Sequence, residues 1–210
     1  MPRRFSFPCL ESRRKAAPTV FFLQRCFPSE FALGFNLILH KIKMSSKKPI
    51  YMIAACSENR AIGKEGGGLP WSISEDTAYW TEKVTGGIII EGRRCFEELG
   101  GPFPNTDTIV LSRNPDFSLD NAYTAVSMES AIELAQNLGG EGPIWICGGP
   151  AVYQAGMPLA EKLYLTQVYD EVEGVAFFPD WRADFAVELD RRDSSDENYS
   201  YSFLVLTRGN

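Results

Sequence analysis

Histidine is almost absent from this 210-residue chain, and its single copy, His40, lies in an N-terminal segment of different composition. Residues 44–210 therefore hold no histidine for acid–base chemistry, for a metal site or for a Ser-His-Asp triad. We expect proton transfer in this part of the chain to use a carboxylate, a tyrosine, a cysteine or a lysine, and we expect no metal ion.

Cysteine is scarce and widely spaced. Of the five cysteines, Cys56, Cys95 and Cys147 fall within residues 44–210, and no C-x-x-C spacing occurs. This spacing argues against a zinc knuckle or a disulfide framework and fits a reducing compartment, so we expect a cytoplasmic location. No apolar run approaches the roughly 20 residues that a membrane span needs, so we expect no membrane partner.

Basic residues are concentrated at the N-terminus. Residues 1–43 hold eight of the 21 Lys and Arg residues and two of the 27 acids, which leaves 13 bases and 25 acids, a net charge of −12, for residues 44–210. So acidic a domain lacks the basic face that nucleic-acid binding requires. Residues 1–43 resemble a mitochondrial presequence, and the alternative is that Met44 is the true start. We therefore treat 1–43 as an extension and 44–210 as one domain.

Strands and helices alternate from Met44 onward. Near-continuous apolar runs at 50–56, 88–90, 108–112, 144–147 and 162–168 indicate strands buried on both faces, and helices are expected between them. Such repeats predict a three-layer α/β/α fold with a mostly parallel sheet. Two late strands without an intervening helix, at 183–189 and 201–206, predict an antiparallel C-terminal edge.

The stretch from Gly66 to Asp76 stands out chemically. Three glycines run into Leu69-Pro70-Trp71, and Ser72-x-x-Glu75 predicts a capping box that opens a helix carrying Asp76. Apolar neighbours would raise the pKa of Asp76 toward that of a general acid, with Thr166 as its hydrogen-bond partner. The alternative for Asp76 is a surface aspartate in an ordinary capped helix. The alternative for Thr166 is an ordinary β-branched strand residue.

Glycines and cations follow the strands at the edge where such sheets bind ligands. Gly92-Arg93-Arg94 starts a helix, Ser112-Arg113 ends the next strand, and Gly148-Gly149 ends a third. Together they favour a dinucleotide site with a pocket for a 2′-phosphate. Solvated arginines and a tight turn are the simpler explanations for these motifs taken singly.

Taken together, these motifs resemble the dihydrofolate reductase family. The resemblance extends over nearly all of residues 49–206. Besides the motifs above, it rests on Ile53-Ala54-Ala55, Ala61-Ile62-Gly63, Ile109–Arg113, Ile146–Gly149, Leu163–Thr166, Val172-Glu173-Gly174 and Phe178-Pro179. The resemblance implies a monomer in which NADPH reduces dihydrofolate to tetrahydrofolate in one-carbon metabolism. It also implies that residues 63–71 form a mobile loop and that Gly148-Gly149 is a cis peptide.

Site residues follow from the same resemblance. The implied catalytic residues are Asp76, Trp71 and Thr166. The implied substrate-binding residues are Ala55, Asp76, Trp80, Leu99, Cys147, Tyr153 and Thr166. The implied cofactor-binding residues are Ala55, Ile62, Gly63, Leu69, Gly92, Arg93, Arg94, Cys95, Ser112, Arg113, Cys147, Gly148, Gly149, Val152 and Tyr153.

Several positions depart from the family pattern. Thr106 stands where the family has an arginine for the glutamate tail of folate, and Glu91 stands where it has an apolar residue. Cys95, Pro150 and Val175 replace a threonine, a glycine and an acidic residue. The alternative function is therefore NADPH-dependent reduction of another pterin or pyrimidine heterocycle that lacks a glutamate tail. A non-catalytic pterin or nucleotide binder is a third reading, which the presence of both Asp76 and Thr166 disfavours.

Overall fold

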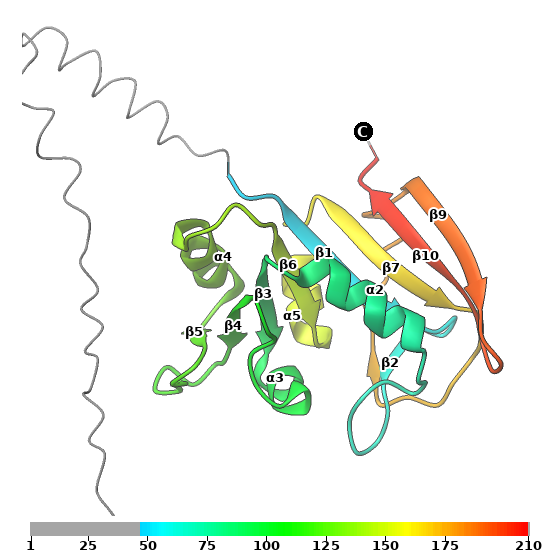
Figure 1. The fold of residues 1–210 in the computed structure, drawn as a ribbon, viewed down its shortest axis with the longest axis horizontal. Helices are drawn as coiled ribbons and strands as arrows, with labels where there is room; N and C mark the ends of the chain where they lie inside the picture. Colours follow the sequence, from blue (N-terminus) through cyan, green and yellow to red (C-terminus); the bar gives the residue numbers. More distant parts are fainter. Residues whose placement is uncertain (1–46, 210) are drawn as a thin grey trace, which may run out of the picture. The chain divides into compact units, whose positions relative to one another are not determined.

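The computed structural model describes residues 47–209, so the prediction for residues 1–43 lies outside the described part of the chain. The predicted alternation of strands and helices is confirmed along this range (Figure 1). The helices are α2 (Ser74–Val84), α3 (Arg93–Leu99), α4 (Met128–Asn137) and α5 (Pro150–Gly156). The strands are β1 (Ile50–Cys56), β2 (Ala61–Gly63), β3 (Ile88–Gly92), β4 (Asp107–Leu111), β5 (Tyr123–Ala125), β6 (Ile144–Gly148), β7 (Lys162–Val168), β8 (Ala176–Phe177), β9 (Val187–Ser195) and β10 (Ser200–Thr207).

One eight-stranded sheet has the order β5-β4-β3-β6-β1-β7-β10-β9. The pairs from β5 to β7 are parallel, whereas β10 pairs antiparallel with both β7 and β9. The predicted mostly parallel sheet with an antiparallel C-terminal edge is thus confirmed. Strands β2 and β8 form a separate two-stranded sheet that the sequence analysis did not predict.

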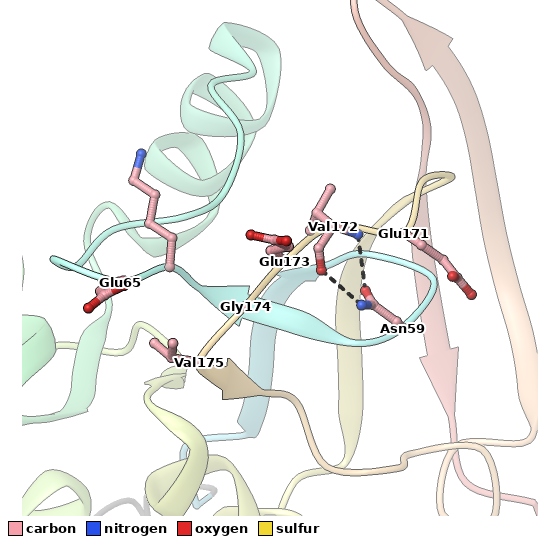
Figure 2. A pocket seen from close by; sticks show the side chains of 8 residues that line it. Asn59, Glu65, Glu171, Val172, Glu173, Gly174 and Val175 are labelled. Atoms are coloured by element: carbon pink, nitrogen blue, oxygen red, sulfur yellow. Dashed lines mark hydrogen bonds between the residues drawn. The ribbon is translucent and has the colours of Figure 1, made fainter.

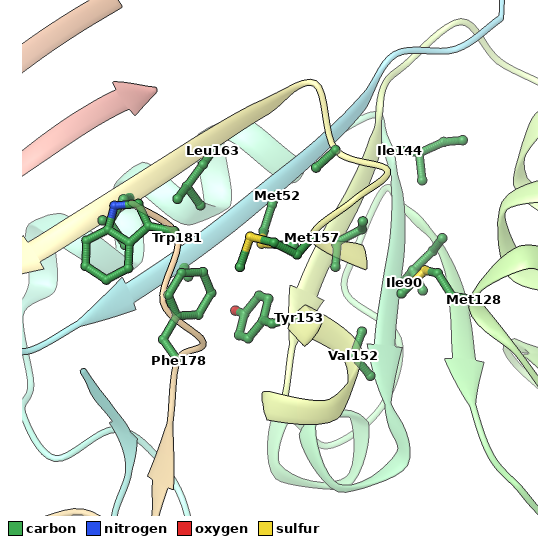
Figure 3. Packing of buried hydrophobic residues seen from close by; sticks show 14 of the residues in the cluster. Met52, Ile90, Met128, Ile144, Val152, Tyr153, Met157, Leu163, Phe178 and Trp181 are labelled. Atoms are coloured by element: carbon green, nitrogen blue, oxygen red, sulfur yellow. The ribbon is translucent and has the colours of Figure 1, made fainter. Parts of the chain in front are cut away.

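Alternate residues of the central strands point to opposite faces of the sheet, as strand geometry requires. Met52, Ile90 and Ile146 pack with residues of α4 and α5 on one face (Figure 3). Ile53, Ile89 and Trp145 pack with Val84 of α2 on the other face. These two apolar layers explain why the strands are apolar throughout, and they make the fold the predicted three-layer α/β/α arrangement.

The first strand of the C-terminal pair was predicted in the wrong place. The prediction was residues 183–189, but β9 runs from Val187 to Ser195. It is an edge strand whose residues are nearly all exposed and largely charged, so no apolar run marks it. The apolar signal at 183–186 comes instead from Phe185, which is buried in the core although it lies outside any strand.

Candidate active site

A cleft of 340 Å³ lies where β1, β3 and β6 end and where α2 and α3 begin. In a parallel sheet the carboxyl ends of the strands meet at one edge, which is the usual place for a ligand. Asp76 and Trp80 of α2 contribute one wall of the cleft, and Leu69 of the glycine-rich loop contributes to its mouth.

Helix α2 begins differently from the prediction. Its N-cap is Ile73, which makes no side-chain capping bond, so the predicted capping box of Ser72 and Glu75 is wrong. The Glu75 carboxylate instead accepts hydrogen bonds from Ser194 Oγ at 2.7 Å and Tyr201 Oη at 2.8 Å, and it pairs with Arg192.

These contacts lower the pKa of Glu75 and hold the start of α2 in place. Hydrogen bonds from Arg192, Ser194 and Tyr201 lower the pKa of Glu75 to about 2, so it stays ionised at neutral pH. Because the partners belong to β9 and β10, Glu75 ties the first turn of α2 to the C-terminal hairpin. Asp76 is the next residue, and this connection therefore fixes the backbone that carries it.

Asp76 is a buried carboxylic acid, with 8% of its surface exposed. Burial raises its pKa above the usual value because the charged form loses its hydration, and the interaction with Thr166 opposes this rise. Thr166 is 2% exposed and pairs in register with Ala55, which lines the cleft. The structure thus brings together the predicted pair Asp76 and Thr166, of which Asp76 lines the cleft.

Glu91 is a second buried acid in the same cleft. It is 1% exposed, and neither carboxylate oxygen has a hydrogen-bond partner among residues 47–209. Burial alone raises the pKa of Glu91 to about 7. The sequence analysis noted Glu91 only as a departure from the family. Its place as the one charge at the end of the apolar run Ile88–Ile90 was the signal that could have marked it.

Two thiols and a phenol that line the cleft stay neutral near pH 7. Burial raises the pKa of the Cys95 thiol to about 11, and it raises the pKa values of Cys147 and Tyr153 well above their ordinary range. The Tyr153 hydroxyl is shared between the carbonyl oxygens of Ile53, at 2.9 Å, and Cys147, at 2.8 Å. It therefore joins β1 to β6.

Most of the predicted residues meet in the cleft. Eleven of them line it: Ala55, Ile62, Leu69, Asp76, Trp80, Cys95, Leu99, Cys147, Gly148, Gly149 and Tyr153. The peptide between Gly148 and Gly149 is cis, as the resemblance implied.

The remaining predicted residues are not among those that line the cleft. Trp71 is buried beside Ile73 in a separate apolar cluster, and Val152 is buried in the main core. The Gly63 carbonyl accepts a bond from the Val175 amide at 2.8 Å. Ser112 lines a neighbouring hollow of 260 Å³ near β4, β5 and α4.

The predicted cations Arg93, Arg94 and Arg113 are exposed and follow the ends of the adjacent strands β3 and β4. Gly92 pairs with Leu111, so Arg93 and Ser112 follow neighbouring residues of adjacent strands. Arg93 and Arg94 are exposed, and they form ion pairs with Glu97 at 3.4 Å and with Glu98 at 3.0 Å. Such exposed pairs contribute little to stability, so both guanidinium groups can exchange partners at small cost.

A larger hollow, of 700 Å³, is lined by a different set of residues (Figure 2). It is formed where Lys64 and Glu65 of the glycine-rich loop face residues 171–175. The Asn59 side chain spans it, since Nδ2 donates to the Val172 carbonyl at 2.8 Å. Its charged side chains are mostly acidic, and Asp76 and Glu91 are not among its lining residues, so we do not assign the reaction to it.

The sequence and the fold match one family. The dihydrofolate reductase family profile matches residues 49–208. The dihydrofolate reductase of Neisseria meningitidis is 40% identical over 165 residues, which cover 76% of this chain and 98% of that protein. The dihydrofolate reductase of Haemophilus influenzae is 35% identical over 161 residues, which cover 75% and 97%.

A solved structure agrees with these matches. The dihydrofolate reductase of Enterococcus faecalis, complexed with NADP(H) and RAB-propyl, has a TM-score of 0.71 and 30% identity to this chain. The match covers 78% of this chain and 98% of that one. The fold and the cleft are those of a nucleotide-dependent oxidoreductase. This chain belongs to the dihydrofolate reductase family.

Glu91→Gln should change the pH dependence of stability. The pKa of Glu91 is raised from 4.5 to about 7 on folding, so the folded protein binds the proton more tightly. Stability is therefore lost as the pH rises from about 4.5 to 7, and the loss approaches about 3 kcal/mol. We expect Glu91→Gln to remove this loss, measured by urea unfolding at acid and mildly alkaline pH. The exposed control Glu97→Gln should keep the wild-type profile, and equal profiles for wild type and Glu91→Gln would contradict the assignment.

Proposed function

We propose that this chain reduces 7,8-dihydrofolate to tetrahydrofolate in the 340 Å³ cleft, with NADPH as the hydride donor. The observation that carries the proposal is the buried Asp76 carboxyl, held beside Thr166 on the wall of a cleft that is otherwise largely apolar. Family membership and the NADP(H) complex of the Enterococcus faecalis relative support the same reaction.

Asp76 has the role of binding the pterin and supporting its protonation. A carboxylate on the wall of a buried cleft accepts hydrogen bonds from the amino and ring N–H groups of a pterin. Its raised pKa means that its proton is less costly to hold near neutral pH than that of an exposed aspartate. Thr166 positions the Asp76 carboxyl. Trp71 packs beside Ile73 at the start of α2 and thereby keeps this end of the helix in place.

The backbone at the cleft floor fits a dinucleotide. Gly148 and Gly149 line the cleft at the end of β6. Because neither carries a side chain, the backbone there is open to close approach by a ligand. NADPH supplies the hydride when it is bound. The protein orients the cofactor and provides the electrostatic environment of the reaction. Ala55, Ile62, Leu69 and Cys147 would contact its nicotinamide end.

Arg93, Arg94, Ser112 and Arg113 would hold the adenosine 2′-phosphate. This role is supported by the pairing of Gly92 with Leu111, which places both segments at the same edge of the sheet. Guanidinium groups give charge-assisted, forked hydrogen bonds to phosphate. Their present partners, Glu97 and Glu98, lie on the same exposed helix and compete weakly.

The glutamate tail of folate would be bound weakly. Thr106 Oγ1 donates to the Phe103 carbonyl at 2.7 Å, so the position offers no cation for a carboxylate. Asp107 beside it is exposed and has the wrong charge. This observation is what keeps reduction of a tailless pterin or pyrimidine heterocycle as a second candidate function.

The setting of the enzyme is part of the same proposal. Residues 44–210 would act as a monomer, and the family match over 49–208 and the single compact unit from Lys47 onward support one catalytic domain. Its net charge of −12 argues against a nucleic-acid partner. Within residues 47–209 no helix has the length and hydrophobicity to cross a membrane. The location would be cytoplasmic, or mitochondrial if residues 1–43 act as a presequence.

Replacing Asp76 by asparagine should stop most turnover. The amide can neither hold the proton nor carry the charge, and loss of a positioned acid typically lowers the rate about 100-fold or more. NADPH affinity should stay near wild type, measured by fluorescence titration alongside steady-state turnover at neutral pH. Near wild-type turnover in Asp76→Asn would contradict the role given to Asp76.

Replacing Arg93 by alanine should weaken NADPH binding by about tenfold to a hundredfold, which is the range for one charge-assisted hydrogen bond. NADH lacks the 2′-phosphate, so its affinity should change little. The measurement is the dissociation constant of each cofactor for both proteins. An equal loss for the two cofactors would refute a role at the 2′-phosphate.

The full chain should oxidise NADPH with dihydrofolate. The kcat/KM for a tailless dihydropterin should lie within about tenfold of that for dihydrofolate. The reason is that the chain lacks the arginine–carboxylate contact to the glutamate tail, which is worth roughly 1.5–3 kcal/mol where it is present. The measurement is kcat/KM for both substrates. Better use of the tailless substrate would favour the second candidate function. Absence of NADPH oxidation with either would overturn the proposal that the chain is a reductase.

A further inference from the structure

Glu91 is a buried acid of the cleft that the reaction above does not use. It belongs to β3, where Ile88 and Ile90 point to the core face and Ile89 points to the α2 face. Strand alternation therefore places Glu91 on the α2 face, the side from which Asp76 enters the cleft. Its carboxyl lies in the wall of the ligand site rather than in the core.

The Glu91 carboxyl has no compensating partner. Both oxygens are buried and unpaired within residues 47–209. A buried polar group in this state carries its full desolvation cost, and a buried charge carries far more. Such an arrangement is stable when the group is protonated or when a ligand changes its surroundings.

Among residues 47–209, no lysine or arginine lines the cleft with Glu91. The titratable side chains that line the cleft with it are Asp76 of α2, Cys95 and Glu98 of α3, Cys147 of β6, and Tyr153 of α5. The negative charge of Glu91 itself helps to raise the pKa values of Cys95, Cys147 and Tyr153. The nearest arginines in sequence, Arg93 and Arg94, pair with Glu97 and Glu98. Burial of the Glu91 carboxyl therefore favours its neutral form, and no residue that lines the cleft offers a compensating positive charge.

A bound dinucleotide would act in the same direction. Filling the cleft displaces water, and the phosphates of the cofactor bring negative charge to the end of β3, one residue beyond Glu91. Both changes disfavour the Glu91 carboxylate. We propose that Glu91 is a proton-binding residue of the cofactor site, and that NADPH binds preferentially to the protein in which the Glu91 carboxyl is protonated.

The proton comes from solvent and adds to a Glu91 oxygen when NADPH enters. Since the pKa of free Glu91 lies near 7, ionised protein predominates above that pH and must take up a proton on binding. The dissociation constant for NADPH should therefore rise by about tenfold for each pH unit above 7. The inference rests on the proposed function, because it takes NADPH as the ligand of the cleft.

The first experiment is a fluorescence titration of the full chain with NADPH from about pH 7.5 to about pH 9. In this range the 2′-phosphate is fully ionised, since its ordinary pKa is about 6. We expect wild-type affinity to fall by about tenfold per pH unit, and Glu91→Gln to bind with an affinity that barely changes with pH. Glu98→Gln is the matched control, because it removes a carboxylate from the rim of the same cleft and should keep the wild-type slope. Equal slopes for wild type and Glu91→Gln would overturn the proposal.

A second measurement keeps the test independent of one variant. Calorimetry of NADPH binding at about pH 8, in two buffers of different ionisation enthalpy, should show uptake of nearly one proton by wild type. Glu91→Met, which restores an apolar side chain, should show almost none. Absence of uptake by wild type would overturn the proposal. Failure of NADPH to bind at any pH would instead refute the proposed function, so the two failures are distinguishable.

Discussion

The site depends on the burial of carboxyl groups that have no positively charged partner. Asp76 and Glu91 both line a cleft in which two thiols and a phenol are held neutral by the same burial. In this setting desolvation decides the protonation states, because the ion pairs of the neighbouring helix are all at its exposed surface. A chain without histidine in this domain can thereby hold protons near neutral pH.

The arrangement of the sheet makes this possible. The register of β1 with β7 sets Ala55 beside Thr166, and packing of α2 on the same face brings Asp76 to them. Glu75 then secures the first turn of α2 to the C-terminal hairpin through Ser194, Tyr201 and Arg192. Two neighbouring acids thus have opposite protonation behaviour: Glu75 is stabilised as the anion, and Asp76 is pushed toward the neutral acid.

Much of this could be predicted where the signal was a run of apolar residues. The buried strands, the parallel sheet and the pairing of Asp76 with Thr166 followed from such runs and from the family resemblance. The edge strand β9 could not be found in this way, because its exposed charged residues carry no burial pattern. The capping box failed because Glu75 makes stronger contacts with distant strands than a local cap offers. Glu91 was visible as a substitution, but only the fold shows that its side chain faces the ligand cleft without a partner.

The central claim is that burial raises the pKa of Asp76 in the protein before any ligand binds. The most direct measurement is an NMR titration of the carboxyl carbons of the full chain, with the Asp76 signal identified by its loss in Asp76→Asn. We expect a midpoint above 3.8, the ordinary value for aspartate. A midpoint at or below that value would mean that the carboxyl is hydrated or paired, and it would contradict the raised pKa of Asp76.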